Sequence, residues 1–300
     1  MKRKILYFIN PISGTRKKSG LEDALNKATT AKGIECEVAH TDANANYIGL
    51  REKILSEKIT DIVICGGDGS VNQIGQNLLG LSVNIGIIPM GSGNGLAFTA
   101  GIPKTISKAL EIIFTGKVKE IDGFRINNRF SCMLCGLGLD AQVAADFANQ
   151  QKRGLASYIR QSTLNFFSAK PYPFEITIKG TTITTEAFFI SIANSNQFGN
   201  NFTIAPKASL TDGLLDIVIV KKMSKLRMIW AVVKQLRNGE VLDLQGETYA
   251  KADILYFQTS RLKIANPMMA PLHIDGEAVE SDLHFNIEII PRALKLLQPG

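Results

Sequence analysis

Short apolar runs alternate with segments of helical spacing up to about residue 120 of the chain. The runs are apolar throughout, which is typical of parallel strands that are buried on both faces of a sheet. Ligands of such sheets bind beyond the carboxyl ends of the strands. The pattern predicts strands at Ile5–Asn10, Ile34–His40, Asp61–Cys65 and Val83–Pro89, and helices at Leu21–Lys32, Asn44–Lys58 and Val71–Leu79.

A different pattern begins near residue 122, where strand-like runs are separated by turn residues. This arrangement is typical of an antiparallel, β-rich domain. Strands are predicted at Asp122–Asn127, Arg129–Leu134, Phe174–Lys179, Ile183–Asn194, Leu215–Lys221, Ile254–Ala265 and Leu283–Ile290, and helical patches at Leu155–Phe167 and Lys225–Leu236. We therefore expect an α/β domain over residues 1–122 and a β-rich domain over residues 123–289, with residues 290–300 as a candidate return to the first domain.

Composition excludes several classes of protein. Hydrophobic residues make up 45% and charged residues 20% of the chain, which is not the composition of a disordered protein. No apolar run approaches the roughly 18 residues that span a bilayer, and the apolar stretch after the basic N-terminus is too short for a signal peptide. The four cysteines, with a single Cys-x-x-Cys at Cys132 and Cys135, predict reduced thiols in a cytoplasmic protein rather than a zinc site.

A glycine-rich loop follows the third predicted strand and leads directly into a helix. It reads Gly66-Gly67-Asp68-Gly69-Ser70. Its glycines allow backbone N–H groups to surround a phosphate at the helix N-terminus. A carboxylate at this place suits a metal ion or a hydroxyl group that must lose its proton. The alternative is a tight turn with a capping side chain.

Two more loops occupy equivalent positions, namely Asn10–Gly14 after the first strand and Gly91–Gly95 after the fourth. Loops at the carboxyl ends of neighbouring parallel strands converge, as binding of a nucleoside triphosphate requires. Neither a P-loop motif nor a complete dinucleotide fingerprint is present.

Acidic residues accompany glycines at two places in the second half. Asp212 and Asp216 flank Gly213 near a turn, for which an ordinary turn is a sufficient explanation. Asp275 and Glu277 flank Gly276, and an extended backbone would direct both carboxylates to one side, as suits a base and a magnesium ligand. An Asp-Gly hairpin explains the same residues equally well.

Taken in order, Asn10–Gly14, Gly66–Gly69, Gly91–Asn94 and Asp275–Glu277 resemble the motifs of the diacylglycerol kinase and sphingosine kinase superfamily of lipid kinases. The resemblance implies a phosphofructokinase-like nucleotide domain, a β-sandwich, and ATP in a cleft between them. It implies Glu277 as proton acceptor with Asp275 beside it, or Asp68 in that role, and a magnesium site formed by Ser209, Asp212 and Leu214. The implied ATP contacts are Asn10, Pro11, Ser13, Gly14, Thr41, Gly66, Gly67, Asp68, Gly69, Ser70, Asn72, Gly91, Ser92 and Asn94.

The implied reaction transfers the γ-phosphoryl group of ATP to a lipid hydroxyl, with Mg²⁺, and we expect a diacylglycerol-type lipid. The loop Gly91–Gly95 is closer to sphingosine and ceramide kinases, and Ser70 replaces a more usual threonine, so a sphingoid or other lipid remains an alternative. A soluble enzyme similar to NAD kinases and a nucleotide-binding regulator without kinase activity are further alternatives.

Charge suggests how a lipid is reached. The formal net charge is +7, and residues 221–237 contain six basic residues and no acid, with apolar residues at helical spacing. That is the pattern of a helix on an anionic membrane surface, although a helix packed on the sandwich shows the same period. Residues 153–170 are a second candidate. We expect a cytoplasmic protein at the inner face of the membrane and no nucleic-acid partner, with a homodimer left open.

Overall fold

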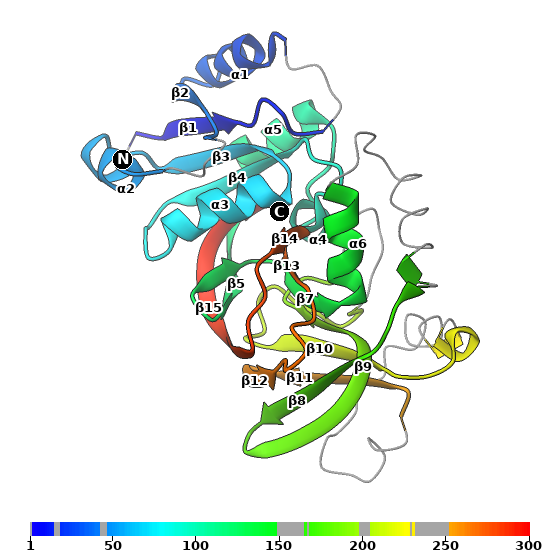
Figure 1. Ribbon diagram of the computed structural model, residues 1–300. Helices are drawn as coiled ribbons and strands as arrows, with labels where there is room; N and C mark the ends of the chain where they lie inside the picture. Colours follow the sequence, from blue (N-terminus) through cyan, green and yellow to red (C-terminus); the bar gives the residue numbers. More distant parts are fainter. Residues whose placement is uncertain are drawn as a thin grey trace. The chain divides into compact units, whose positions relative to one another are not determined.

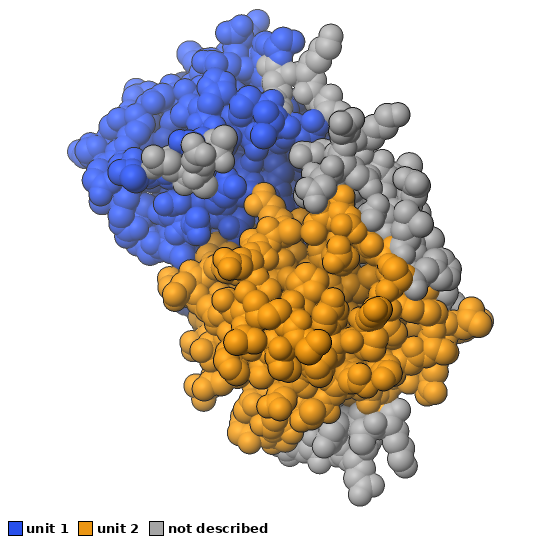
Figure 2. Space-filling model, in the orientation of Figure 1, with its two compact units in different colours: residues 1–121, 292–300 blue, residues 122–291 orange. Residues whose placement is uncertain are grey.

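The computed structural model describes residues 2–14, 19–42, 47–148, 165–166, 168–197, 205–228, 230–231 and 252–300 (Figure 1). The chain forms two compact units. Unit 1 contains residues 1–121 and 292–300, and unit 2 contains residues 122–291 (Figure 2). Unit 2 is therefore inserted into unit 1 near the end of the sequence.

Unit 1 is built on a parallel sheet, as predicted. Its strands are β1 (Lys4–Ile9), β2 (Glu35–His40), β3 (Asp61–Gly66) and β4 (Asn84–Pro89), in the order β2-β1-β3-β4. Every residue of β3 is buried, as expected for a central strand with both faces covered. Lys295 and Leu296 of β15 (His284–Gln298) pair with β4 in parallel and extend this sheet.

Helices connect the strands of unit 1. They are α1 (Leu21–Thr30), α2 (Leu50–Ser56), α3 (Asp68–Leu78), α4 (Gly95–Thr99) and α5 (Ile106–Thr115). The first three were predicted, but α2 begins later than expected because Gly49 precedes it in a left-handed conformation (φ 81°). The prediction missed α5, although three of its apolar residues, Ala109, Leu110 and Ile113, recur at helical spacing and are buried.

A buried ion pair ties together the amino-terminal edge of this sheet. The Arg3 guanidinium donates two 2.9 Å hydrogen bonds to the Asp61 carboxylate, and it also bonds the carbonyl groups of Ile113 and Phe114 at the end of α5. The Asp61 side chain is fully buried. Arg3 thus connects β1, β3 and α5 opposite the edge where a ligand would bind.

Unit 2 is a β-sandwich, which confirms the predicted fold class. It contains the helix α6 (Leu139–Ala148), and its core is formed by apolar residues such as Phe174, Ile190 and Phe257. The long strand β9 pairs with β8, β7 and β10, so it takes part in both layers. The strands are β5 (Lys117–Ile126), β6 (Arg129–Ser131), β7 (Leu134–Gly138), β8 (Tyr172–Ile178), β9 (Thr181–Ala193), β10 (Leu215–Lys221), β11 (Ile254–Thr259), β12 (Arg261–Ala265), β13 (Leu272–Ile274), β14 (Glu277–Val279) and β15.

Two predicted strands of unit 2 are wrong in their bounds. The run Arg129–Leu134 covers β6, which ends at Ser131, and only the first residue of β7. The run Ile254–Ala265 is two strands, β11 and β12, that separate at Ser260. The strand β11 pairs with β10, whereas β12 pairs with β8 and β15. The β propensity of the run Ile254–Ala265 is high throughout, so the sequence does not show where the pairing strand changes. Most of the helical patch at 155–167, and of the second patch beyond residue 231, lies outside the described residues.

Candidate active site

Three loops of unit 1 meet at the carboxyl edge of its sheet, as their spacing predicted. Asn10, which follows β1, donates a 2.8 Å hydrogen bond from Nδ2 to Ser70 Oγ in α3. The N–H of Met90, which follows β4, donates to the carbonyl oxygen of Gly66 at 2.8 Å. The ends of β1, β3 and β4 are therefore joined by direct hydrogen bonds.

Glycines allow these loops to approach so closely. A Cβ atom on Gly14 (φ +62°) would lie 2.1 Å from the carbonyl oxygen of Met90. A Cβ atom on Gly91 would lie 2.5 Å from Cα of Gly67. Both distances are far below van der Waals contact, so any larger residue would move one loop away from the other.

The N-terminus of α3 lies at this meeting point. Gly67 is the N-cap residue in extended conformation, and none of the side chains that the structure describes caps the helix. Glycine and serine occupy the second and third positions of the helix, so the first-turn N–H groups are not covered by large side chains. Such a terminus, with its partial positive charge, binds phosphate groups.

Two side chains that the resemblance assigned to ATP also hold the loops together. Asn94, which is 2% exposed and left-handed (φ 57°), accepts a hydrogen bond from the N–H of Gly91 and donates one to its carbonyl oxygen. The Asp68 carboxylate accepts the N–H groups of Gly95 and Leu96 at 3.1 and 3.4 Å, and so caps α4. Their geometry explains the loop shape, while direct contact with ATP stays a prediction.

The remaining predicted ATP residues lie around the same loops. Thr41 follows β2, and its N–H donates to the carbonyl oxygen of Ile9 at 3.0 Å. Ser13 is buried and donates from Oγ to the carbonyl oxygen of Asn10, whereas Pro11 is exposed. The others, Gly69, Asn72 and Ser92, are half-buried.

In unit 2, the residues Asp275 and Gly276 form the turn between β13 and β14. Both have positive φ, 49° and 84°, as a two-residue hairpin turn with Asp-Gly requires. Of the two predicted alternatives, the Asp-Gly hairpin is confirmed, and the extended backbone with both carboxylates on one side is wrong. Ile274 pairs directly with Glu277 across the hairpin. Periodicity alone could not choose between the two alternatives, because the turn falls within the motif itself.

The two carboxylates have different environments. Asp275 is 6% exposed and accepts hydrogen bonds from Ser131 Oγ at 2.6 Å and from the N–H of Leu134 at 3.0 Å. It fixes the hairpin to the segment between β6 and β7. Glu277 is exposed at the start of β14, yet partial desolvation, followed by repulsion from Asp275, raises its pKa. Glu277 is thus the carboxylate that can reach a ligand.

Sequence reasoning missed a buried pair that one residue of this hairpin forms with a residue of α6. His273 Nε2 lies 3.4 Å from Asp140 Oδ2, and the His273 side chain is fully buried. Burial raises the pKa of Asp140, and the contact with His273 opposes that shift. A Gly-Leu-Gly-Leu-Asp run at 136–140 was the available signal, because a glycine within a strand often marks a place where another group approaches closely.

The predicted magnesium residues lie on one turn of unit 2. Leu214 N–H donates to Asp212 Oδ1 at 3.0 Å, and Ser209 Oγ accepts from the N–H of Thr211 at 3.4 Å. The carboxylate of Asp122 accepts the N–H of Gly213 at 2.8 Å. Desolvation raises the pKa of Asp212, and the Asp122 charge adds to it.

This set of groups suits Mg²⁺, which prefers oxygen ligands and relieves repulsion between carboxylates. Ser209, Asp212 and Leu214 offer hydroxyl, carboxylate and carbonyl oxygens. Across the described part of the chain, no cluster of three or more His, Cys, Asp or Glu side chains could hold a metal ion. A magnesium site here would therefore depend on hydroxyl and main-chain oxygens or water.

At the described start of the basic helix, three basic residues contact other residues of unit 2, while membrane binding stays a prediction. Lys222 pairs with Glu186 at 2.8 Å, and Arg227 pairs with Asp253 at 2.7 Å. Lys225 lies 4.2 Å from the ring centroid of Phe188. Leu226 and Trp230, by contrast, are 76% and 77% exposed. The side chains of Lys222 and Arg227 are also exposed, at 58% and 64%, so this segment presents both charged and apolar groups, and these three basic residues have partners within unit 2.

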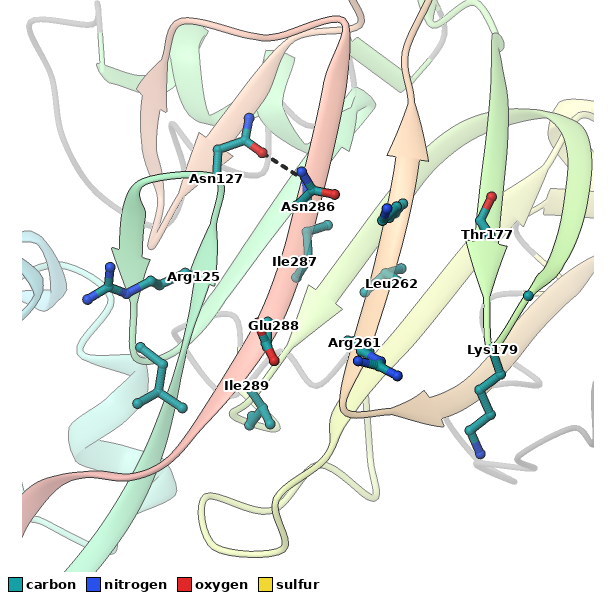
Figure 3. A pocket seen from close by; sticks show the side chains of 13 residues that line it. Arg125, Asn127, Thr177, Lys179, Arg261, Leu262, Asn286, Ile287, Glu288 and Ile289 are labelled. Carbon is teal, nitrogen blue, oxygen red and sulfur yellow. Dashed lines mark hydrogen bonds between the residues drawn. The ribbon is translucent and has the colours of Figure 1, made fainter.

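A shallow groove of about 990 Å³ crosses the outer face of β5, β15, β12 and β8 in unit 2 (Figure 3). Side chains of both charges line it, and Arg261 lies directly across from Glu288 in the strand register. Its other basic residues are Arg125, Lys179 and Lys263. The groove contains none of the residues predicted for ATP, magnesium or catalysis.

Comparison with known proteins agrees with these motifs. The family described as diacylglycerol kinase catalytic domain matches residues 4–126. The family described as YegS C-terminal NAD kinase beta sandwich-like domain matches residues 134–298, which is more than half of the chain. Within the described residues, no helix has the length and apolar character needed to cross a membrane.

Curated relatives and solved structures cover nearly the whole chain. A "Probable lipid kinase YegS-like" of Shewanella frigidimarina is 27% identical over 91% of this chain and 87% of the relative, and the "Diacylglycerol kinase" of Bacillus subtilis is 28% identical over 92% and 90%. A crystal structure from Bacillus anthracis (24% identity, TM-score 0.80) covers 100% of this chain and 97% of its own, and shows the same fold. The chain therefore belongs to the diacylglycerol kinase and YegS family, and it is a lipid kinase.

Proposed function

We propose that this lipid kinase transfers the γ-phosphoryl group of ATP to a hydroxyl group of a diacylglycerol-type lipid. The observation that carries the proposal is the meeting of three glycine-bearing loops with the uncapped N-terminus of α3. A triphosphate needs several N–H donors in one place, and this edge supplies them. The diacylglycerol kinase name of the Bacillus subtilis relative supports the choice of lipid.

Glu277 is the base in this proposal. Its carboxylate is exposed, whereas both oxygens of Asp68 accept N–H groups of α4 and Asp275 is buried among donors. In the transfer, the lipid hydroxyl oxygen forms a bond to the γ-phosphorus while the bond to the β–γ bridging oxygen breaks and ADP leaves. The hydroxyl proton passes to Glu277.

We assign Mg²⁺ to the turn that contains Ser209, Asp212 and Leu214. A bound cation supplies positive charge that compensates Asp212 and the neighbouring Asp122. The chain's own contribution is to hold this turn in place. Tyr256 does so by accepting the N–H of Lys207 at 3.0 Å and donating to the buried Asp216 at 2.5 Å.

The lipid partner implies peripheral binding to the inner face of the membrane. The exposed pair Leu226 and Trp230 supports this part of the proposal, because Trp and Leu side chains four residues apart share one helix face. Tryptophan is favoured at the boundary between headgroups and acyl chains.

The decisive experiment is a radiolabelled ATP assay with a panel of diacylglycerol, monoacylglycerol, sphingosine, ceramide and phosphatidylglycerol. We expect phosphate transfer to diacylglycerol by the wild type, and a loss of about 100-fold or more in kcat for Glu277→Gln with an unchanged Kd for ATP. Transfer to sphingosine or ceramide instead would support the sphingoid alternative. ATP binding with no lipid product would favour a regulator, and equal rates for the two proteins would exclude Glu277 as base.

A further inference from the structure

The turn that precedes Glu277 is hydrogen-bonded to a buried imidazole. The N–H of Gly276 donates to His273 Nδ1 at 3.3 Å, and His273 lies on β13, within the same hairpin. An imidazole nitrogen that accepts a hydrogen bond carries no proton, so in the neutral ring the proton must be on Nε2. The Nε2 atom is the one that lies 3.4 Å from Asp140 Oδ2.

Gly136 makes this contact possible. It pairs with His273 in the register of β7 and β13. A Cβ atom on Gly136 would lie 1.9 Å from Asp140 Oδ2 and 2.7 Å from His273 Nε2. The space above Gly136 is thus where the carboxylate and the imidazole meet, and no larger residue fits there.

The carboxylate comes from a separate element. Asp140 is in the first turn of α6, and its Oδ1 accepts the N–H of Ala141 at 2.9 Å. The helix α6 packs against β7, β13 and β14. A chain of contacts therefore runs from α6 through Asp140 and His273 to the N–H of Gly276, which directly precedes Glu277.

We propose that His273, oriented by Asp140, is a positioning residue that sets the turn conformation and thereby the place of the Glu277 carboxylate. This inference rests on the proposed role of Glu277 as base. The imidazole touches neither nucleotide nor lipid in this scheme. It acts by fixing the Gly276 N–H, on the side of the turn that Asp275 does not hold.

Two substitutions separate the two functions of the ring. In His273→Asn, the side-chain oxygen can replace Nδ1 as acceptor for Gly276, but the donor toward Asp140 is lost. In His273→Gln, the amide nitrogen can replace Nε2 toward Asp140, but the acceptor for Gly276 is lost. We expect His273→Gln to lower kcat about tenfold or more at unchanged KM for ATP, because misplacing a catalytic group is costly. His273→Asn should retain most of kcat while lowering thermal stability more.

Activity and stability then change in opposite orders, which a merely structural histidine would not produce. If kcat of His273→Gln equals that of the wild type, or if kcat follows stability in both variants, the inference is wrong. Nitrogen-15 NMR of the wild-type protein gives an independent test: it should show His273 protonated at Nε2 only, and a proton on Nδ1 would overturn the inference. The NMR spectrum remains readable if no lipid is phosphorylated, so failure of the proposed function is distinguishable.

Discussion

Gly14 shows how one residue can decide whether the first and fourth loops of unit 1 meet. Its positive φ alone would cost another residue about 1–2 kcal/mol, and its close approach to the Met90 carbonyl leaves no space for a methyl group. Gly33 has a similar φ of +69°, but no described atom lies within 4 Å of the place that a methyl group would take there. A comparison of the two glycines therefore distinguishes the cost of backbone strain from the cost of a steric clash.

We predict that Gly14→Ala weakens ATP binding about tenfold or more, since the first loop must move away from the fourth. Gly33→Ala should destabilise the fold by about 1 kcal/mol through backbone strain, with normal ATP affinity. Calorimetric titration with ATP and urea denaturation of both variants would measure these effects. Equal ATP affinity of the two variants would contradict the predicted steric role.

The raised pKa of Glu277 predicts a pH dependence. A base must be unprotonated, so kcat is retained above the pKa of Glu277 and lost as pH falls through it. Because desolvation and Asp275 raise that pKa, the acidic limb should lie above the value of about 4.3 of an ordinary glutamate. The pH–rate profile should lose this limb in Glu277→Gln. A limb at or below the ordinary glutamate value would contradict the prediction.

At the residue scale, the sequence could predict those features of the site that depend on residues next to one another in the chain. Glycines next to strand ends are a local signal, and they correctly indicated that three loops converge. The Asp-Gly pair correctly indicated a hairpin as one of two alternatives at Asp275, but alternation of residues could not exclude the extended backbone. The Asp140–His273 contact joins residues far apart in sequence, and only the pairing of β7 with β13 brings them together.

The elements of unit 1 are held at their amino-terminal edge by charge as well as by apolar packing. Besides Arg3, the Asp61 carboxylate accepts hydrogen bonds from Thr60 Oγ1 at 2.6 Å and from Asn84 Nδ2 at 3.2 Å. Breaking a buried pair costs more than removing both partners, because one charge is left without compensation.

We predict that Arg3→Met lowers the free energy of unfolding by about 2–3 kcal/mol, somewhat less than for a fully buried pair, since the Arg3 side chain is 28% exposed. The double variant Arg3→Met, Asp61→Asn should be less destabilised than the sum of the two single variants, by about 1 kcal/mol or more. Urea denaturation of the wild type, the two single variants and the double variant completes this double-mutant cycle. Strict additivity would mean that the ion pair contributes nothing specific.

Helices and strands were predictable where the periodicity of apolar residues was strong and each strand kept the same neighbouring strands along its length. The parallel strands of unit 1 are such a case. The division of Ile254–Ala265 into β11 and β12 was not predictable, because both halves have the same propensity and differ only in the strands that they contact. Tertiary pairing, rather than local preference, sets that boundary.

At the scale of the whole molecule, the net charge of +7 first suggested attraction to an acidic surface. The described part of the basic helix adds to this interpretation. Lys222 and Arg227 are exposed and have acidic partners, and Leu226 and Trp230 are exposed beside them. Membrane contact through this segment would therefore combine charge with apolar insertion.

We predict that vesicles of phosphatidylglycerol and phosphatidylcholine shift the fluorescence of Trp230 to shorter wavelength. It is the single tryptophan of the chain, so the signal reports on this segment alone. Leu226→Glu should weaken vesicle binding about tenfold or more, because a leucine contributes roughly 1.5–3 kcal/mol when buried. Leu55→Glu, at a leucine that is 63% exposed in α2, is the matched control. Equal vesicle binding of the two variants would exclude insertion by this segment.

The insertion of unit 2 into unit 1 has a consequence for biosynthesis. On the ribosome, β1 to β4 are complete about 200 residues before Lys295 and Leu296 exist to pair with β4. During that time β4 presents an unpaired edge, which is a site for wrong association between nascent chains. The sheet of unit 1 thus acquires its last strand only after the sandwich has been synthesised, and until then the edge of β4 needs protection from wrong pairing.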